Sequence, residues 1–285
     1  MAFRRAAALG LLLPLAAFAG PAHAQGGEGG GGNAASTLDV EYNIYVGGIT
    51  LGQLTMSLRM EGESYKAIST LRTSGVVDAL WSAKIEASSS GTIEGGNLKP
   101  TLYYASSQHS DANQQVTVKF PASGAPSYFA EPAYSNPARL AQPADQVNTL
   151  DPVSAMVSIA TAFRSQGAKP CGTTLPIYDA RRRYEVALSF ERNANVDMDN
   201  GLYAGPVDIC RLVHKPISGA PQKISRDGKL PLLRAWMISV QSSADPSRRF
   251  VVPLRIWTQA GDIGIAAAVL SSVRLDGAKL AKLNK

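Results

Sequence analysis

Strict alternation of apolar and polar residues is the feature that most constrains how this chain can fold. Residues 40–46 read valine, glutamate, tyrosine, asparagine, isoleucine, tyrosine, valine, and comparable runs recur along most of the chain, separated by short polar turns. Side chains two residues apart in a strand point to the same face, so each run predicts a half-buried strand. About twelve such runs at short spacing predict a mainly β protein. We expect a large curved antiparallel sheet that forms a barrel, a half-barrel or a spiral.

Only one segment has a convincing helical period. Four apolar residues between Val153 and Ala160 recur at spacing i, i+3, i+4 and i+7, after Asp151 as a cap and Pro152 in the first turn. The spacing predicts one main helix over about residues 151–164, packed on the sheet. Before it, five prolines between residues 121 and 143 predict a long irregular connection.

The N-terminus resembles a secretion signal. Arg4 and Arg5 precede a short apolar run at residues 6–18, and Ala22-His23-Ala24 follows as a small-x-small cleavage site. We therefore expect residues 1–24 to be a cleaved signal peptide and the mature protein to be periplasmic. A retained helical anchor is the alternative, although the run is shorter than the roughly 20 apolar residues that a spanning helix needs.

The rest of the chain divides by composition. Residues 25–36 are rich in glycine and predict a flexible leader. Residues 37–278 have the length of a single β-rich domain. The lysine-rich residues 279–285 predict a frayed basic tail.

The charge of the chain excludes one class of partner. Basic residues number 28 and acidic residues 22, and no stripe of lysine and arginine interleaves with aromatic residues. We therefore expect no nucleic-acid binding. Attraction to an anionic envelope surface would be unspecific.

The two cysteines of the chain are Cys171 and Cys210. In an exported protein they predict one structural disulfide, which would close a loop of about 40 residues and stabilise the fold by roughly 4 kcal/mol. Two buried free thiols are the alternative. No neighbouring histidine or cysteine completes a zinc site, so we expect no metal.

Signals of catalysis are nearly absent. The chain has no G-x-S-x-G elbow, H-E-x-x-H motif, phosphate-binding loop or dinucleotide fingerprint, so we expect neither an enzyme nor a cofactor. His109 lies in the run Ser106–Asp111, where serine, histidine and aspartate are adjacent in sequence on a predicted surface loop. Catalytic groups normally converge from different parts of a scaffold instead.

Two groups of residues remain as candidate binding sites. Arg181, Arg182 and Arg183 form either a solvated hairpin corner or an anion contact. Five aromatic residues could line a hydrophobic groove, although core packing is the default for aromatic residues on strands. They are Trp81, Tyr103, Tyr104, Trp236 and Trp257.

Several short motifs occur together in a fixed order. They are Tyr42-x-Ile44-Tyr45-x-Gly47-Gly48, Pro100-x-x-Tyr103, Asp151-Pro152-Val153-Ser154-Ala155, Cys171-Gly172, Tyr178-Asp179-x-Arg181-Arg182-Arg183-Tyr184, Tyr203-x-Gly205 and Val252-Pro253-Leu254-Arg255. Their order and spacing resemble the exported bacterial proteins grouped as domain of unknown function 3108, over about residues 38–275.

The resemblance implies an exported β-rich protein with no assigned reaction. More distantly, the chain resembles periplasmic β-spiral envelope-integrity proteins and half-barrel lipoprotein carriers, as an analogy of fold alone. One departure is Ala180, where the family pattern leads us to expect glycine after Asp179. If that glycine provides a positive φ, Ala180 requires a different turn.

Two functional hypotheses follow. The first is a non-catalytic periplasmic envelope protein that binds a lipid, a lipoprotein or another hydrophobic envelope component in its curved sheet, and a dry concave pocket would support it. The alternative is a protein–protein scaffold for envelope integrity, which predicts a filled interior and an exposed apolar or aromatic patch on the outer face. A third and weaker hypothesis is an envelope hydrolase that uses His109.

Overall fold

The protein is described by a computed structural model, and we describe residues 35–74, 82–109, 113–161, 171–219, 232–259 and 264–283. All of them belong to one compact unit, Asn33–Lys285. The predicted signal peptide and nearly all of the glycine-rich leader lie outside the described residues.

The described chain is mainly β, as predicted, with one α-helix and two short 3-10 helices. The strands, in chain order, are β1 (Ser36–Val46), β2 (Ile49–Glu61), β3 (Ser64–Thr73), β4 (Ala83–Glu94), β5 (Asn97–His109), β6 (Asn113–Lys119), β7 (Ser127–Glu131), β8 (Thr173–Tyr178), β9 (Arg183–Asp197), β10 (Ala204–Ser218), β11 (Leu233–Gln241), β12 (Arg249–Gln259), β13 (Ile265–Leu275) and β14 (Ala278–Lys279). The helices are η1 (Pro137–Arg139), η2 (Pro143–Gln146) and α2 (Pro152–Ala160).

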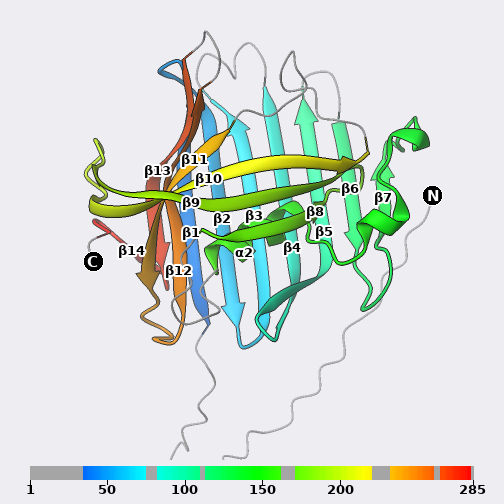
Figure 1. Cartoon of the computed structure of the whole chain (residues 1–285), viewed down its shortest axis with the longest axis horizontal. Coiled ribbons are helices and arrows are strands. Elements are labelled where there is room, and N and C mark those ends of the chain that lie inside the picture. Colours follow the sequence, from blue (N-terminus) through cyan, green and yellow to red (C-terminus); the bar gives the residue numbers. More distant parts are fainter. Residues whose placement is uncertain are drawn as a thin grey trace, which may run out of the picture. The chain divides into compact units, whose positions relative to one another are not determined.

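All fourteen strands belong to one open antiparallel sheet in the order β7-β6-β5-β4-β3-β2-β1-β13-β12-β11-β10-β9-β8, with β14 beside β13. The first and last long strands are therefore neighbours near the middle, where Val40 pairs with Val273. β7 and β8 are the two outermost strands of the described sheet. The sheet curves so far that β8, β9 and β10 cross in front of the strands of the first half (Figure 1).

Helix α2 lies between these two layers and contacts β3, β4, β5, β8 and β12. Asp151 caps it by accepting a hydrogen bond from Ser154 N at 2.8 Å, as the sequence predicts. The helix is shorter than predicted because Thr161 already has non-helical dihedral angles, φ −112° and ψ 16°. Residues 162–170 lie outside the described part of the chain.

Two hydrophobic clusters hold the layers together. The larger joins the inward residues of β1–β7, such as Leu58 and Val118, to Val153 and Val157 of the helix. The smaller joins β8–β12 and includes Leu175, Met237 and both cysteines. Strands β11 and β12 contribute to both clusters, because Val251 faces one cluster and Val252 the other.

Three details differ from the sequence-based expectations or refine them. The proline-rich connection contains a strand, β7, which prolines bound on both sides. Pro253 is accommodated by a bulge between β11 and β12, since the register shifts between Trp236 and Met237. The tail does not fray over its described part: Leu283 is only 3% exposed, and its N–H donates to Leu202 O at 2.7 Å.

Candidate functional site

A cleft of about 600 Å³ opens where β8 faces the β4–β5 hairpin and the connection between β6 and β7. Its walls combine buried and half-buried apolar side chains with polar groups from β4, β5, β8 and the segment before α2. The apolar residues include Leu98, Pro100, Phe120, Leu150 and Leu175. The polar residues include Glu94, Lys99, Thr101, Asn148, Thr149 and Thr174. This volume lies within the range of small-molecule binding sites, about 300–1,000 Å³.

The segment that leads into α2 forms one wall of the cleft and is held by buried hydrogen bonds. Gln146 Nε2 donates to Ala141 O at 2.8 Å, and Thr149 Oγ1 donates to Gln146 O at 2.7 Å. Leu150 then pairs with β8 in a single parallel bridge to Ile177. These bonds fix the wall to the sheet, so the cleft is pre-formed.

A buried polar cluster anchors α2 to the first half of the sheet. Asp151 accepts hydrogen bonds from Ser89 Oγ at 2.7 Å and from the hydroxyl of Ser154, which also lies 2.7 Å from Tyr65 Oη. Burial raises the pKa of Asp151 above its usual value, and the hydrogen bonds from Ser154 and Ser89 offset only part of that effect. Burial likewise raises the pKa of Tyr65 to about 12. All four side chains are buried, so the cluster positions the helix and does not face a substrate.

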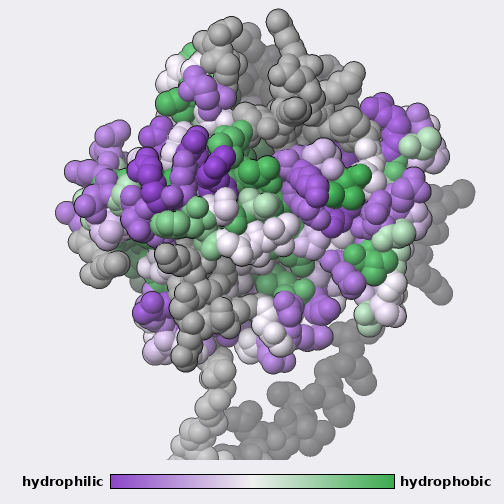
Figure 2. All heavy atoms as spheres, viewed as in Figure 1, coloured by the Kyte–Doolittle hydropathy of each residue, from purple (hydrophilic) through white to green (hydrophobic). Residues whose placement is uncertain are grey.

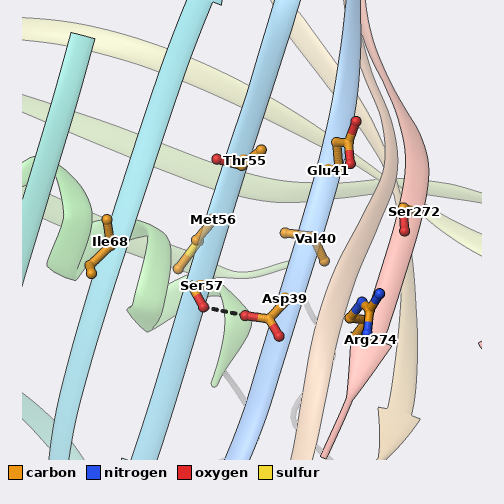
Figure 3. Close-up of a pocket in the computed structure, with 9 residues that line it drawn as sticks. All are labelled: Asp39, Val40, Glu41, Thr55, Met56, Ser57, Ile68, Ser272 and Arg274. Atoms are coloured by element: carbon orange, nitrogen blue, oxygen red, sulfur yellow. Dashed lines mark hydrogen bonds between the residues drawn. The ribbon is translucent and has the colours of Figure 1, made fainter. Parts of the chain in front are cut away.

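The face of the sheet that points away from α2 carries a second feature, a shallow hollow of about 200 Å³ (Figure 3). Asp39, Ser57, Ile68 and Arg274 line it, and Ser57 donates a hydrogen bond to Asp39. A single cross-strand row continues from this hollow to the edge of the sheet. In order from β1 to β7 it contains Asp39, Ser57, Ile68, Ser88, Tyr104, Thr117 and Phe129.

Three apolar side chains of this row are exposed. Ile68 is 58% exposed, Phe129 is 64% exposed, and Tyr104 lies between them on β5. On the opposite side of the molecule, seen in Figure 2, hydrophobic side chains of the described residues occur in small groups among hydrophilic ones.

The three arginines lie at the turn between β8 and β9, and their groups have partners within the protein. Arg182 Nε donates to Asp179 Oδ2 at 2.9 Å, and Arg181 packs over the ring of Tyr134 at 5.7 Å. The side chain of Arg183 is only 11% exposed and donates to Asp145 O and Tyr184 O. Arg183 is therefore not part of a solvated corner. Contact with an external anion remains a prediction.

Ala180 keeps the backbone conformation for which glycine was expected. Its φ is 72°, and its side chain is fully buried. Asp179 Oδ1 accepts hydrogen bonds from the backbone N–H groups of Arg181 and Arg182, which holds the turn in shape. The expectation that alanine requires a different turn is therefore wrong.

The predicted groove aromatics do not converge on one surface. Tyr103 is buried in the larger cluster, whereas Tyr104 points to the opposite face of β5. Trp236 and Trp257 contact each other on β11 and β12 at 5.5 Å, and Arg255 packs over both rings. Trp81 lies outside the described residues.

The remaining predicted residues are placed as follows. Cys171 and Cys210 form the predicted disulfide, with Cα atoms 5.6 Å apart, and it joins the start of β8 to β10. His109 ends strand β5 rather than lying in a loop, and its Nε2 is 2.9 Å from Ser107 Oγ. In the described part of the chain, no group of three or more metal-binding side chains could hold an ion. The described helices include none long and apolar enough to cross a membrane.

The family model described as protein of unknown function DUF3108 matches residues 41–246, well over half of the chain. The chain belongs to this family. The matched region runs from β1 into the loop between β11 and β12, so it includes the cleft, the disulfide and the arginine turn. It leaves β13 outside, although that strand completes the sheet beside β1.

Among solved structures, the chain is similar to a β-barrel-like protein of the domain of unknown function DUF1849 from Brucella abortus. The two share 10% sequence identity with a TM-score of 0.48, and the similarity covers 85% of this chain and 98% of that chain. Among curated proteins, none matches this chain.

Proposed function

We propose that this protein is a non-catalytic periplasmic binding protein that takes a ligand in the cleft beside β8. The observation that carries the proposal is the cleft itself, which combines a suitable volume with apolar walls and polar groups from several strands and loops. Export is supported by the signal-like N-terminus and by the disulfide, which is stable in an oxidising compartment.

The position of α2 argues against an acyl chain on the concave side of the sheet. The helix and its contacts with β3, β4, β5, β8 and β12 occupy that side. A hydrophobic or amphipathic envelope component would instead lie at the rim, in the cleft. A lipid, a lipoprotein segment or a peptide all remain compatible with this position.

The proposal is tested by native mass spectrometry of the mature protein purified from its own periplasm. Ser123 is exposed and lines the cleft, so Ser123→Trp would obstruct the cleft without disturbing the core. Ser189→Trp, on the exposed side of β9 away from the cleft lining, is the matched control. We expect a bound mass with the parent and with Ser189→Trp but not with Ser123→Trp. Equal occupancy of all three proteins would refute the cleft as the binding site.

Two observations favour a second candidate function, a protein–protein scaffold. The outer face of the sheet exposes Ile68, Tyr104 and Phe129 in one cross-strand row, and helix α2 fills the interior. Replacing these three side chains by serine should abolish crosslinking to an envelope partner and leave the fold intact. Crosslinking that survives the triple replacement would exclude this face.

A further inference from the structure

We propose that the ligand of the cleft is an extended peptide segment that pairs with the free edge of β8. This inference rests on the proposed function and specifies the class of ligand. The segment would add one short strand to the sheet, a known mode of peptide recognition in which backbone hydrogen bonds provide affinity and side-chain pockets provide specificity.

The hydrogen bonds of β8 show which of its backbone groups are free. On the outer edge, Pro176 O accepts from Leu150 N and Tyr178 N donates to Leu150 O, both at 2.8 Å. Backbone groups alternate between the two sides of a strand, so the N–H and C=O of Thr174 point to this same outer edge. β8 pairs with β9 only on its other side. Among the described strands, none covers the donor and the acceptor that Thr174 presents on this edge.

The neighbouring segment stops just before it could cover Thr174. Continued in parallel register from the bridge between Leu150 and Ile177, Asn148 would lie opposite Leu175. Asn148 instead adopts φ 57°, which turns the chain away from β8. The outer edge of β8 is consequently paired with Leu150 at one end only. The other end, which comprises Thr173, Thr174 and Leu175, lines the cleft.

The size and chemistry of the cleft fit a short peptide. Leu150 already occupies the outer edge at Pro176. The residues of β8 that line the cleft before this point, Thr173–Leu175, span about 10 Å, which accommodates a segment of about three residues. On one side the segment would meet Leu98, Pro100 and Phe120, so alternate apolar side chains are favoured there. Glu94 and Lys99 lie in the lining of the same cleft and would select for charge at the ends of the segment.

The test uses the full mature protein and an equimolar mixture of hexapeptides of random sequence, followed by backbone amide shifts in NMR. We expect the mixture to shift the amides of Thr101, Thr149 and Leu175, which line the cleft. The Thr174→Pro variant removes the N–H that points to the outer edge. Pro176, two residues further along β8, shows that this strand accepts a proline facing the same edge. The substitution should weaken peptide binding at least about tenfold. Thr174→Ala keeps the backbone donor, so its response should be clearly stronger than that of Thr174→Pro.

A second arm needs no variant, so it stands even if Thr174→Pro does not fold. The same mixture with every amide N-methylated cannot pair with a strand edge and should leave the cleft amides unshifted. A response to the methylated mixture as strong as to the unmodified one would overturn the inference. So would a Thr174→Pro protein that is folded by circular dichroism and binds like the parent.

The two proposals fail in different ways. The peptide inference would be overturned, and the binding function still supported, if the cleft held a non-peptide ligand that Ser123→Trp removes and did not respond to peptides. A cleft that carries no ligand by mass spectrometry and responds to neither peptide mixture would overturn both.

Discussion

Asp151 is a fully buried carboxylate whose hydrogen bonds come only from neutral groups. It serves as the helix cap and also as the acceptor that ties α2 to Ser89 on β4. Asp276 offers a contrast within the same chain, because it is more exposed and accepts bonds from Thr37 N, Ala244 N and the hydroxyls of Ser242 and Ser243. Burial alone would raise the pKa of Asp276, but these bonds outweigh it and lower that pKa.

We predict opposite pH dependences for the two aspartates. The pKa of Asp151 is higher in the folded protein than in the unfolded chain. The free energy of unfolding therefore falls as the pH rises from the unfolded pKa to above the folded pKa. The loss is about 1.4 kcal/mol for each unit by which the folded pKa is raised. Asp151→Asn lacks this loss, so its stability relative to the parent should increase between pH 3 and pH 7. Denaturant unfolding at several pH values measures it.

Asp276→Asn is the control with the opposite sign. The lowered pKa of Asp276 contributes stability above its unfolded pKa, and this stability disappears as pH falls through the folded value. The variant should therefore be less stable than the parent at neutral pH and approach it in acid. Parallel pH profiles for the two variants would contradict the assigned directions.

Gly219, directly after β10, is required for a reason other than its φ of 89°. A Cβ at this position would lie 2.4 Å from Arg181 O and 3.0 Å from Arg182 Cα, both backbone atoms of the arginine turn. Gly277 has a similar φ of 81° but open space around it. Gly277→Ala should cost only the left-handed strain of about 1–2 kcal/mol, whereas Gly219→Ala should cost clearly more. Thermal unfolding of both variants compares them, and equal losses would show that the turn can yield.

At the level of elements, the disulfide fixes the strand that borders the cleft. Cys171 lies two residues before β8, and Cys210 lies in the middle of β10 with its side chain fully buried. The bond therefore connects the edge strand to a strand two places further into the sheet. This bond and the hydrogen bond from Gly172 N to Leu188 O at 2.9 Å both hold the start of β8 against the sheet.

Replacing both cysteines by serine should lower the free energy of unfolding by about 4 kcal/mol, the value that the chain-entropy model gives for a loop of this length. Reductant should destabilise the parent to a similar extent and leave the double variant unchanged. Denaturant titrations with and without reductant measure this. A parent that is insensitive to reductant and equal in stability to the variant would show that the bond does not stabilise the fold.

The elements also show what sequence patterns can and cannot predict. Alternation located twelve of the described strands, because a half-buried strand of ten residues leaves a strong local signal. It missed β7 and β14, since prolines bound the former and two residues form the latter. The prediction of an aromatic groove was wrong for a reason that the sequence itself contains. Adjacent residues of a strand, such as Tyr103 and Tyr104, point to opposite faces of the sheet. The cleft had no local signal, as its walls come from segments far apart in the chain.

For the whole molecule, the C-terminal tail is part of the packing. After β14, Leu280 N donates to Val273 O, and Leu283 packs against the larger cluster. We predict that Leu283→Ser lowers the free energy of unfolding by about 2–3 kcal/mol, through loss of a buried leucine. Lys282→Ser, at an exposed neighbouring position, should change it by less than about 0.5 kcal/mol. Equal effects in thermal unfolding would mean that the tail does not stabilise the fold.

The pairing of β1 with β13 governs how the molecule is made. The hydroxyl of Ser271 bonds to the carbonyl of Glu41, a residue 230 positions earlier. At 5–20 residues per second, a ribosome needs about 10–50 s to add that much chain. Throughout this interval the first half can build its hairpins, but one side of β1 stays open and ready to pair with any other unfinished strand. Strand β13, which joins the two halves of the sheet, is thus translated long after β1, and anything that shields β1 until then protects the nascent chain from aggregation.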